Sequence, residues 1–231
     1  MEELKQGLTA FGIMPTEEMC SKFADYERLL LEWNEKMNLT AITEHDGIVN
    51  KHFVDSISCQ SLIPVGSAVA DVGTGAGFPG IPLKIVRPDL HVTLMDALAK
   101  RLTFLDTVTE TLALDNTETV HMRAEDAGHS PCREAFDVVC ARAVASLPVL
   151  CEYCMPLVKP GGVFLAMKGT EGAQEAKSAE KAVKILGGKI MEIRDVSWQD
   201  MSHTVVVIQK TGQTPSKYPR KAGKPQKSPI S

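Results

Sequence analysis

The chain has 231 residues, a hydrophobic content of 44% and a formal net charge of −4, which are ordinary values for a globular protein. No apolar run approaches the roughly 20 residues that a membrane span needs, and the N-terminus lacks the basic start and apolar core of a signal peptide. We therefore expect a cytoplasmic protein with no membrane partner, whose six cysteines are reduced thiols.

Residues 1–63 are predicted to form a helical extension that packs on the rest of the chain. Thr16 is the predicted N-cap of a helix whose apolar side chains recur at three- and four-residue spacing, with charges between them. A capping-box-like pattern at Thr43 predicts the start of a second helix. Between the two, Asn34 and Asn38 fit helix C-capping, although this role suits Asn34 better than both residues at once.

The glycine-rich stretch of residues 68–80 is predicted to be a buried strand, a loop and the start of a helix. The alternate glycines Gly73, Gly75 and Gly77 let the backbone turn sharply and bring its N–H groups close to a ligand. The register G-x-G-x-x-G matches nicotinamide- or flavin-binding enzymes but leaves Asp71 and Gly73 unexplained. The register D-h-G-x-G-x-G explains both and is the one seen in adenosylmethionine-dependent methyltransferases. There a carboxylate beside the loop suits a ligand with an ammonium and a sulfonium group.

Strands and helices alternate through residues 64–210, which we interpret as one domain. Further strands are predicted at 91–96, 119–122, 136–141, 163–167, 190–196 and 204–209. Helices of 10–15 residues between strands are typical of a doubly wound parallel sheet. No helix separates the last two strands, so the final strand should run antiparallel. The predicted fold class is therefore α/β, with a Rossmann-like, seven-stranded, mostly parallel sheet.

Polar residues follow several of these strands, at the edge where open α/β sheets bind ligands. Asp96 ends the second strand, where an acid can accept hydrogen bonds from ribose hydroxyls and can also cap the next helix. Ala124 and Glu125 follow the third strand, where an acid and backbone amides can read adenine edges. Arg142 stands alone in an apolar run after the fourth strand. Since an unpaired buried charge is costly, we expect a polar ligand or an acidic partner beside it.

Metal binding is not expected. The pair Cys151-x-x-Cys154 has no second cysteine pair and lies within a predicted helix. The six histidines show no paired ligand spacing.

Residues 211–231 are predicted to be an irregular basic tail. Residues 210–231 carry six lysine or arginine residues and no acid, although the whole chain is acidic. A polyanionic partner bound locally and an ordinary disordered tail both fit this pattern.

The order of these motifs resembles the RsmG family, also called glucose-inhibited division protein B, of small-subunit rRNA guanine-N7 methyltransferases. The matching segments run from Trp33 to Gly169, and the basic C-terminus is similar as well. The segments are Trp33-Asn34-x-x-x-Asn38-Leu39-Thr40, His52-Phe53-x-Asp55-Ser56, Asp71 to Leu83, Arg87-Pro88, Asp96-x-x-x-Lys100-Arg101, Arg142-Ala-x-Ala-Ser and Met167-Lys168-Gly169. One departure is Ala97, where members often carry serine; we expect no effect on cofactor use.

The resemblance implies a class I methyltransferase that uses S-adenosyl-L-methionine. Its substrate would be N7 of a guanine in 16S rRNA, the position-527 guanosine of the 530 loop. The partner would be 16S rRNA or the 30S ribosomal subunit and not DNA, and the protein would be a monomer. N7 has a free lone pair and no proton, so the reaction needs positioning and exclusion of water and no general base. One alternative is a methyltransferase acting on another RNA, a protein or a small molecule. Another is a nucleotide-binding regulatory module without turnover.

Pattern and resemblance together give three sets of candidate site residues. The cofactor-binding set is Asp71, Gly73, Gly75, Gly77, Phe78, Asp96, Ala124, Glu125 and Arg142. The substrate-positioning set is Arg142 and Lys168, which could donate to guanine O6. The RNA-binding set is Asn38, His52, Lys100, Arg101, Arg220 and Lys221. If the tail binds RNA, deleting residues 215–231 should weaken RNA binding and flatten its salt dependence, with cofactor affinity nearly unchanged.

Overall fold

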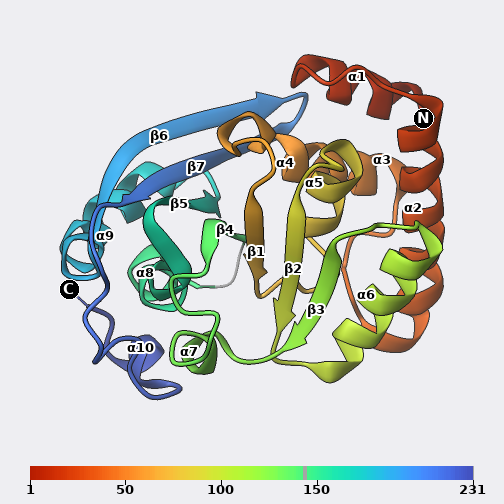
Figure 1. Cartoon of the computed structure of the whole chain (residues 1–231). Helices are drawn as coiled ribbons and strands as arrows, with labels where there is room; N and C mark the ends of the chain where they lie inside the picture. The colour runs from red at the N-terminus through yellow and green to blue at the C-terminus, as the bar shows by residue number, and fades with distance from the viewer. Residues whose placement is uncertain (143–144, 231) are drawn as a thin grey trace.

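The computed structural model describes residues 1–142 and 145–230, which contain a seven-stranded sheet with helices on both faces (Figure 1). The strands are β1 (Ala68–Val72), β2 (His91–Asp96), β3 (Thr117–His121), β4 (Phe136–Arg142), β5 (Val158–Lys168), β6 (Gly188–Trp198) and β7 (Met201–Lys210). Their order in the sheet is β3-β2-β1-β4-β5-β7-β6. The first five strands pair in parallel, and β7 is antiparallel to both neighbours. The predicted fold class is confirmed. Ala143 of the Arg142 motif lies outside the described residues.

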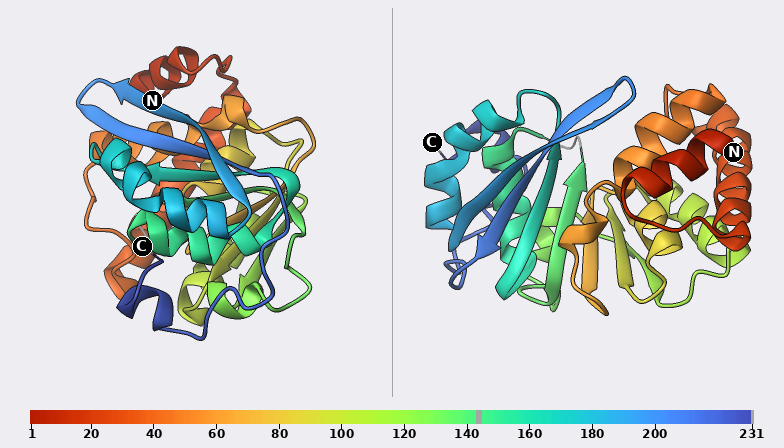
Figure 2. Two further views of the ribbon diagram at one scale, coloured as in Figure 1. Left: turned by 90° about the vertical axis from the view of Figure 1, so that its left-hand side faces the viewer. Right: turned by 90° about the horizontal axis from the view of Figure 1, so that it is seen from above.

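Helices lie on both faces of the sheet, in two separate layers (Figure 2). The helical segments are α1 (Glu2–Ala10), α2 (Glu17–Met37), α3 (His45–Ile48), η1 (Val49–Val54), α4 (Asp55–Ile57), η2 (Gln60–Leu62), α5 (Gly80–Val86), α6 (Ala99–Thr111), α7 (Ala124–Ala127), α8 (Leu147–Cys154), η3 (Met155–Leu157), α9 (Gly172–Ile185) and α10 (Lys224–Lys227). The N-terminal helices share one apolar core with α5 and α6, and α8 and α9 bury a second core on the opposite face. Among the described residues, no helix is both long and apolar enough to cross a bilayer.

The ends of the N-terminal helices test two predictions. Helix α2 begins as predicted, because Thr16 Oγ1 accepts the N–H of Met19 at 3.1 Å. It ends at Asn38, which has the left-handed conformation with φ of 49°. The predicted cap at Thr43 is wrong, because Glu44 takes the extended N-cap position of α3 and no side chain caps that helix.

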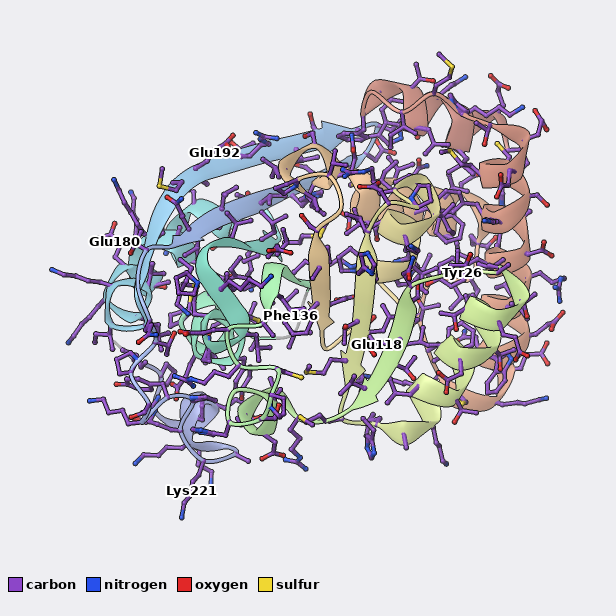
Figure 3. All side chains as sticks on the ribbon, in the orientation of Figure 1. Tyr26, Glu118, Phe136, Glu180, Glu192 and Lys221 are labelled. Atoms are coloured by element: carbon purple, nitrogen blue, oxygen red, sulfur yellow. The ribbon has the colours of Figure 1, made fainter. Side chains whose placement is uncertain are left out.

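Tyr26 of α2 joins the N-terminal helices to the glycine loop. Its side chain is fully buried, within the densely packed helical layer that Figure 3 shows, and its hydroxyl donates to the carbonyl of Ala76 at 2.5 Å. Its ring lies 5.3 Å from that of Phe53 and 5.5 Å from that of Phe78, centroid to centroid. Aromatic pairs at such distances add about 0.5–1.5 kcal/mol to the burial of their surface. The helical extension therefore supports the loop directly.

The segment after β7 packs on the core. Residues 211–223 are irregular, as predicted, but α10 forms one short helical turn that the sequence did not predict. Pro225 and Ile230 are buried, and Arg220 forms an ion pair at 2.6 Å with Glu152, whose side chain is fully buried. A disordered tail is therefore the wrong interpretation for the described part of this segment.

Candidate functional site

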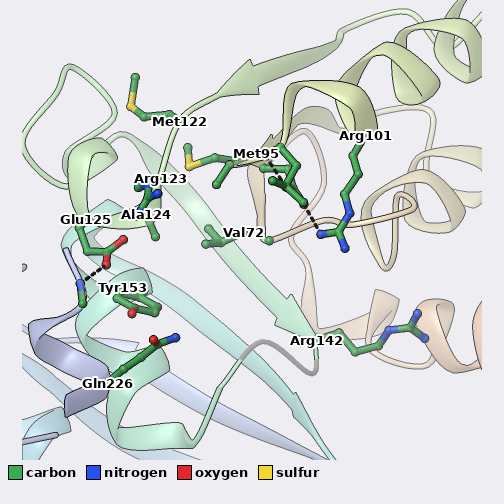
Figure 4. A pocket seen from close by; sticks show the side chains of 15 residues that line it. Val72, Met95, Arg101, Met122, Arg123, Ala124, Glu125, Arg142, Tyr153 and Gln226 are labelled. Atoms are coloured by element: carbon green, nitrogen blue, oxygen red, sulfur yellow. Dashed lines mark hydrogen bonds and ion pairs between the residues drawn. The ribbon is translucent and has the colours of Figure 1, made fainter. Parts of the chain in front are cut away.

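Two cavities lie at the carboxyl ends of the parallel strands, where open α/β sheets bind ligands. The larger, about 470 Å³, extends from Gly73 across the end of β2 to α7 (Figure 4). The smaller, about 250 Å³, lies between the glycine loop and His52. Gly73 and Arg142 line both. We call them the large and the small cavity and treat them as adjacent halves of one site.

The glycine loop has the geometry that its sequence predicts. Gly73, Gly75 and Gly77 all have positive φ, of 72°, 62° and 99° respectively, which side chains other than glycine rarely adopt. The N–H groups of Gly73 and Thr74 both donate to the carbonyl of Met95, at 2.9 and 3.1 Å. The loop is therefore hydrogen-bonded to the end of β2 and passes between the two cavities.

Asp71 lies beneath this loop and is fully buried. Its Oδ2 accepts from Thr74 Oγ1 at 2.7 Å and from the N–H of Gly80 at 2.8 Å. Its Oδ1 has no hydrogen-bond partner among the described residues. Burial raises the pKa of Asp71 to about 6, in spite of these two hydrogen bonds. Burying a negative charge is unfavourable, and the Asp71 carboxylate is therefore suited to a nearby cationic ligand.

Asp96 accepts hydrogen bonds from two neighbouring segments, but it is not the N-cap of α6, which is Leu98, and its contact with a ribose stays a prediction. Its Oδ1 accepts from the N–H of Leu98 at 2.9 Å, at the start of α6, and its Oδ2 accepts from the N–H of Gly75 at 3.0 Å. Arg101 Nη1 lies 3.2 Å from the same Oδ2 and lines the large cavity. Arg101 thus faces the cavity, whereas the sequence placed it among the RNA contacts.

The far end of the large cavity is formed by α7 and by the C-terminal segment. Ala124, Glu125 and Tyr153 line it, together with Gly223 and Gln226 from the segment after β7. Deleting residues 215–231 would therefore remove part of the wall of the large cavity, and the expected effect on cofactor affinity stays a prediction. This contact could not be inferred from the sequence, because the segment carries no strand or long helix whose position could be predicted.

Three side chains stack across the small cavity. The ring of His52 lies 4.5 Å from that of Phe78, with 23° between their planes, and the Arg142 guanidinium lies 4.9 Å from the Phe78 centroid. Burial and the charge of Arg142 lower the pKa of His52 to about 4, so the imidazole is neutral at pH 7. Thr40 Oγ1 lies 2.8 Å from His52 Nε2. The Asn34 side chain exchanges two hydrogen bonds with the backbone of Thr40, so it orders this loop and does not cap α2.

Arg142 has the acidic partner that its apolar surroundings predicted. Its Nη1 donates to Asp55 Oδ2 at 2.7 Å and to the carbonyl of Lys51 at 3.1 Å, and Nη2 lies 3.3 Å from His52 Nδ1. His203 Nδ1 lies 2.7 Å from the other oxygen of Asp55. Burial raises the pKa of Asp55, but His203 and Arg142 outweigh this effect and leave the pKa below its usual value. Sequence reasoning missed Asp55 and His203, although Asp55 belongs to a motif quoted above.

The other candidates have different surroundings. Lys168 Nζ donates to the carbonyl of Ala145 at 2.6 Å and pairs with Glu175 at 3.1 Å, and its side chain is 8% exposed. Of the two cavities, it lines neither. We therefore assign Lys168 a structural role, contrary to the prediction that it positions substrate.

Of the predicted RNA contacts, three are exposed side chains and one, Arg220, is paired within the protein. Asn38, Lys100 and Lys221 are exposed, and Figure 3 shows Lys221 projecting outward from the tail. Arg220 donates from Nε and Nη2 to the buried carboxylate of Glu152, so its charge is neutralised within the protein. This pairing argues against the predicted role of Arg220 in binding phosphates.

The sheet order, the antiparallel β7 and the glycine loop after β1 define the class I methyltransferases. Two solved structures share this fold. TrmN from Thermus thermophilus has a TM-score of 0.53 and 18% sequence identity, and the match covers 70% of this chain and 53% of TrmN. M. jannaschii TYW2 in complex with AdoMet has a TM-score of 0.57 and 14% sequence identity, and the match covers 74% of this chain and 79% of TYW2. The family model of GidB, described as rRNA small subunit methyltransferase G, matches residues 19–204.

Curated relatives agree with this match. The ribosomal RNA small subunit methyltransferase G of Acetivibrio thermocellus is 52% identical over 98% of this chain and 95% of the relative. That of Bacillus velezensis is 46% identical over 100% of this chain and 98% of the relative. The chain therefore belongs to the rRNA small subunit methyltransferase G family and is a methyltransferase.

Proposed function

We propose that this enzyme transfers a methyl group from S-adenosyl-L-methionine to N7 of a guanine in 16S rRNA. By family resemblance the target is the position-527 guanosine. The observation that carries the proposal is the small cavity, whose stacked side chains His52, Phe78 and Arg142 adjoin the glycine loop. An aromatic and cationic surface of this kind suits an unstacked nucleobase.

The large cavity fits the adenosyl cofactor by its donors and acceptors. Asp96 offers carboxylate oxygens near the loop, and Ala124 and Glu125 lie at the far end. Asp71 lines neither cavity, so its buried charge would act on the ligand through the glycine loop, where a negative charge suits a cationic amino acid moiety. When bound, adenosylmethionine supplies an electrophilic methyl group on its sulfonium. The protein's residues orient the two substrates and exclude water around them.

The protonation states of His52 and Asp55 are consistent with methyl transfer to a nucleobase atom that carries no proton. His52 is neutral at pH 7 but is buried against Phe78, and Asp55 is engaged by Arg142 and His203. Guanine N7 needs no general base, because its lone pair is free. The three hydrogen bonds of Arg142 use three of the five N–H groups of a guanidinium. The remaining N–H groups are suited to donate to guanine O6.

Exposed side chains around the site, two lysines and one asparagine, supply phosphate contacts in this proposal. Lys100 begins α6 beside the large cavity, Lys221 lies on the outer side of the tail, and Asn38 ends α2 next to the loop that holds Thr40. A-form RNA has a narrow major groove, so N7 is accessible in a loop or distorted region. We propose that the partner is 16S rRNA, free or within the 30S subunit, and that a monomeric, cytoplasmic enzyme binds it without DNA or membrane contacts.

Methyl transfer to ribosomal substrates tests the proposal. Purified protein is mixed with labelled adenosylmethionine and with 30S subunits or naked 16S rRNA from a strain that lacks the enzyme. We expect label in 16S rRNA, recovered as N7-methylguanine and mapped to one nucleotide. Label that survives ribonuclease treatment would favour a protein or small-molecule substrate. Absence of label on both ribosomal substrates would contradict the proposal.

Asp96 provides a separate test of cofactor binding. We expect Asp96→Ala to weaken the binding of S-adenosylhomocysteine by about 1–3 kcal/mol, because charge-assisted hydrogen bonds to the ligand are lost. Calorimetry measures the change. Lys100→Ala is the matched control, since Lys100 lies close to Asp96 in the sequence, in α6, but does not line the large cavity. An unchanged dissociation constant would leave Asp96 with its hydrogen bonds to Gly75 and Leu98 alone.

A further inference from the structure

The segment after β7 forms part of the wall of the large cavity. Gly223 and Gln226 line this cavity beside Glu125 and Tyr153. Figure 4 shows Gln226 beneath Tyr153, on the same side of the cavity as Glu125. Gln226 is not one of the residues that carry the family resemblance, and the glycine-loop motif does not include this wall.

Several contacts fix the position of this segment. Glu152 accepts both the backbone N–H of Arg220, at 2.7 Å, and its Nε–H, at 2.9 Å. Arg133 donates to the carbonyls of Tyr218 and Thr214, at 2.9 and 2.6 Å. These bonds cross 68 to 85 residues of sequence. The segment is therefore a built part of the domain, and the cavity wall that it provides has a defined position.

The same segment orients Glu125. The N–H of Gly223 donates to Glu125 Oε1 at 3.2 Å, and Gly223 has a positive φ of 77°. Burial and the neighbouring Glu125 carboxylate raise the pKa of Tyr153 to about 12, so its hydroxyl stays protonated beside that carboxylate. Glu125 is itself 9% exposed. Its carboxylate is thus held at the cavity end by groups from two elements far apart in sequence.

We propose that Gln226 contacts the adenine edge of the cofactor and, with Glu125, selects adenine over a 6-oxopurine. This inference rests on the proposed use of an adenosyl cofactor. A primary amide presents one acceptor and one donor, which complement the amino group of adenine and an adjacent ring nitrogen. The carboxylate of Glu125 accepts only, so it also favours an amino group. A 6-oxo group would face the carboxylate of Glu125 and leave its oxygens unpaired.

Calorimetric binding to the full chain tests this role without any methyl transfer. The ligands are S-adenosylhomocysteine and S-inosylhomocysteine, which differ in the amino or oxo group of the base. For Gln226→Ala we expect roughly three- to tenfold weaker binding of the adenosyl ligand, the value of one neutral hydrogen bond. The inosyl ligand should lose less, so the preference for adenine should shrink. Gln226 is exposed, and we expect an unchanged melting temperature.

Lys227→Ala is the matched control, since Lys227 lies next to Gln226 in α10 but lines neither cavity. We expect it to bind both ligands as the parent does. Equal loss in the two variants, or unchanged adenosyl binding by Gln226→Ala, would overturn the role of Gln226 while leaving the proposed function intact. A parent chain that binds neither ligand would overturn both.

Discussion

Replacing Asp71 by asparagine is expected to stabilise the fold at neutral pH and to weaken cofactor binding. The variant keeps an oxygen that can accept from Thr74 and Gly80 but carries no charge. Since burial raises the pKa of Asp71 from 3.8 to about 6, the folded state binds the proton more tightly than the unfolded state. The parent should therefore lose stability as pH rises from about 4 to about 6. A shift of roughly two pKa units corresponds to about 3 kcal/mol.

Urea unfolding of both proteins between pH 4.5 and pH 7.5 measures this contribution. The free energy of unfolding of Asp71→Asn, relative to the parent, should rise from pH 4.5 to slightly above the folded-state pKa of about 6 and be constant from there to pH 7.5. Calorimetry at pH 7.5 should show weaker binding of adenosylmethionine, because the buried negative charge no longer attracts a cationic ligand. If the free energies of unfolding of the two proteins differed by the same amount at every pH, the charge of Asp71 would not destabilise the fold. Unchanged affinity would limit Asp71 to supporting the loop.

Gly77→Ala is expected to unfold the loop and destabilise the whole domain. A Cβ at this position would lie 2.7 Å from Ile81 Cγ1, 2.7 Å from Tyr26 Oη and 2.9 Å from Leu105 Cδ2. The residue also has φ of 99°, which is strained for alanine. Backbone strain and overpacking each cost about 1–3 kcal/mol, so we expect a loss of about 2–6 kcal/mol. Denaturant unfolding monitored by circular dichroism measures it.

Gly75→Ala is the matched control for this prediction. Gly75 also has a positive φ, of 62°, but the nearest atom to an added Cβ is the carbonyl oxygen of Gly73 at 3.9 Å. Only the left-handed conformation should then cost energy, about 1–2 kcal/mol. A loss for Gly75→Ala as large as that for Gly77→Ala would show that conformation, and not contact with Tyr26, sets the cost.

The glycine loop and Asp96 could be predicted because their signals are local in the sequence. The apolar run, the alternate glycines and an acid at the next strand end specify a turn and its supports within 30 residues. The fold followed from the same periodicity, because alternating strands and helices restrict the sheet to few topologies. Arg142 is an intermediate case. Its apolar surroundings indicated a partner, but Asp55 lies 87 residues away and no local pattern identifies it.

The tail could not be placed from its sequence. Proline-rich and lysine-rich composition indicates an absence of regular structure, and the fixed contacts of Arg220 and Gly223 depend on side chains of α7 and α8. The prediction of a helix cap at Thr43 was wrong for a related reason. Capping depends on the backbone conformation of a single residue, and the extended conformation falls on Glu44. Contacts between distant segments and single-residue conformations are set by the tertiary structure.

Two contacts that support the proposed binding site, Tyr26–Ala76 and Gly223–Glu125, can form at different times during synthesis. Tyr26 and Ala76 are 50 residues apart, so the loop can be supported soon after β1 emerges from the ribosome. Gly223 and Glu125 are 98 residues apart, and their contact forms only after the whole sheet has been translated. A nascent chain would thus have its glycine loop well before the far end of its large cavity is closed. Full cofactor affinity should accordingly be acquired late, once residues 219–227 pack against α7 and α8.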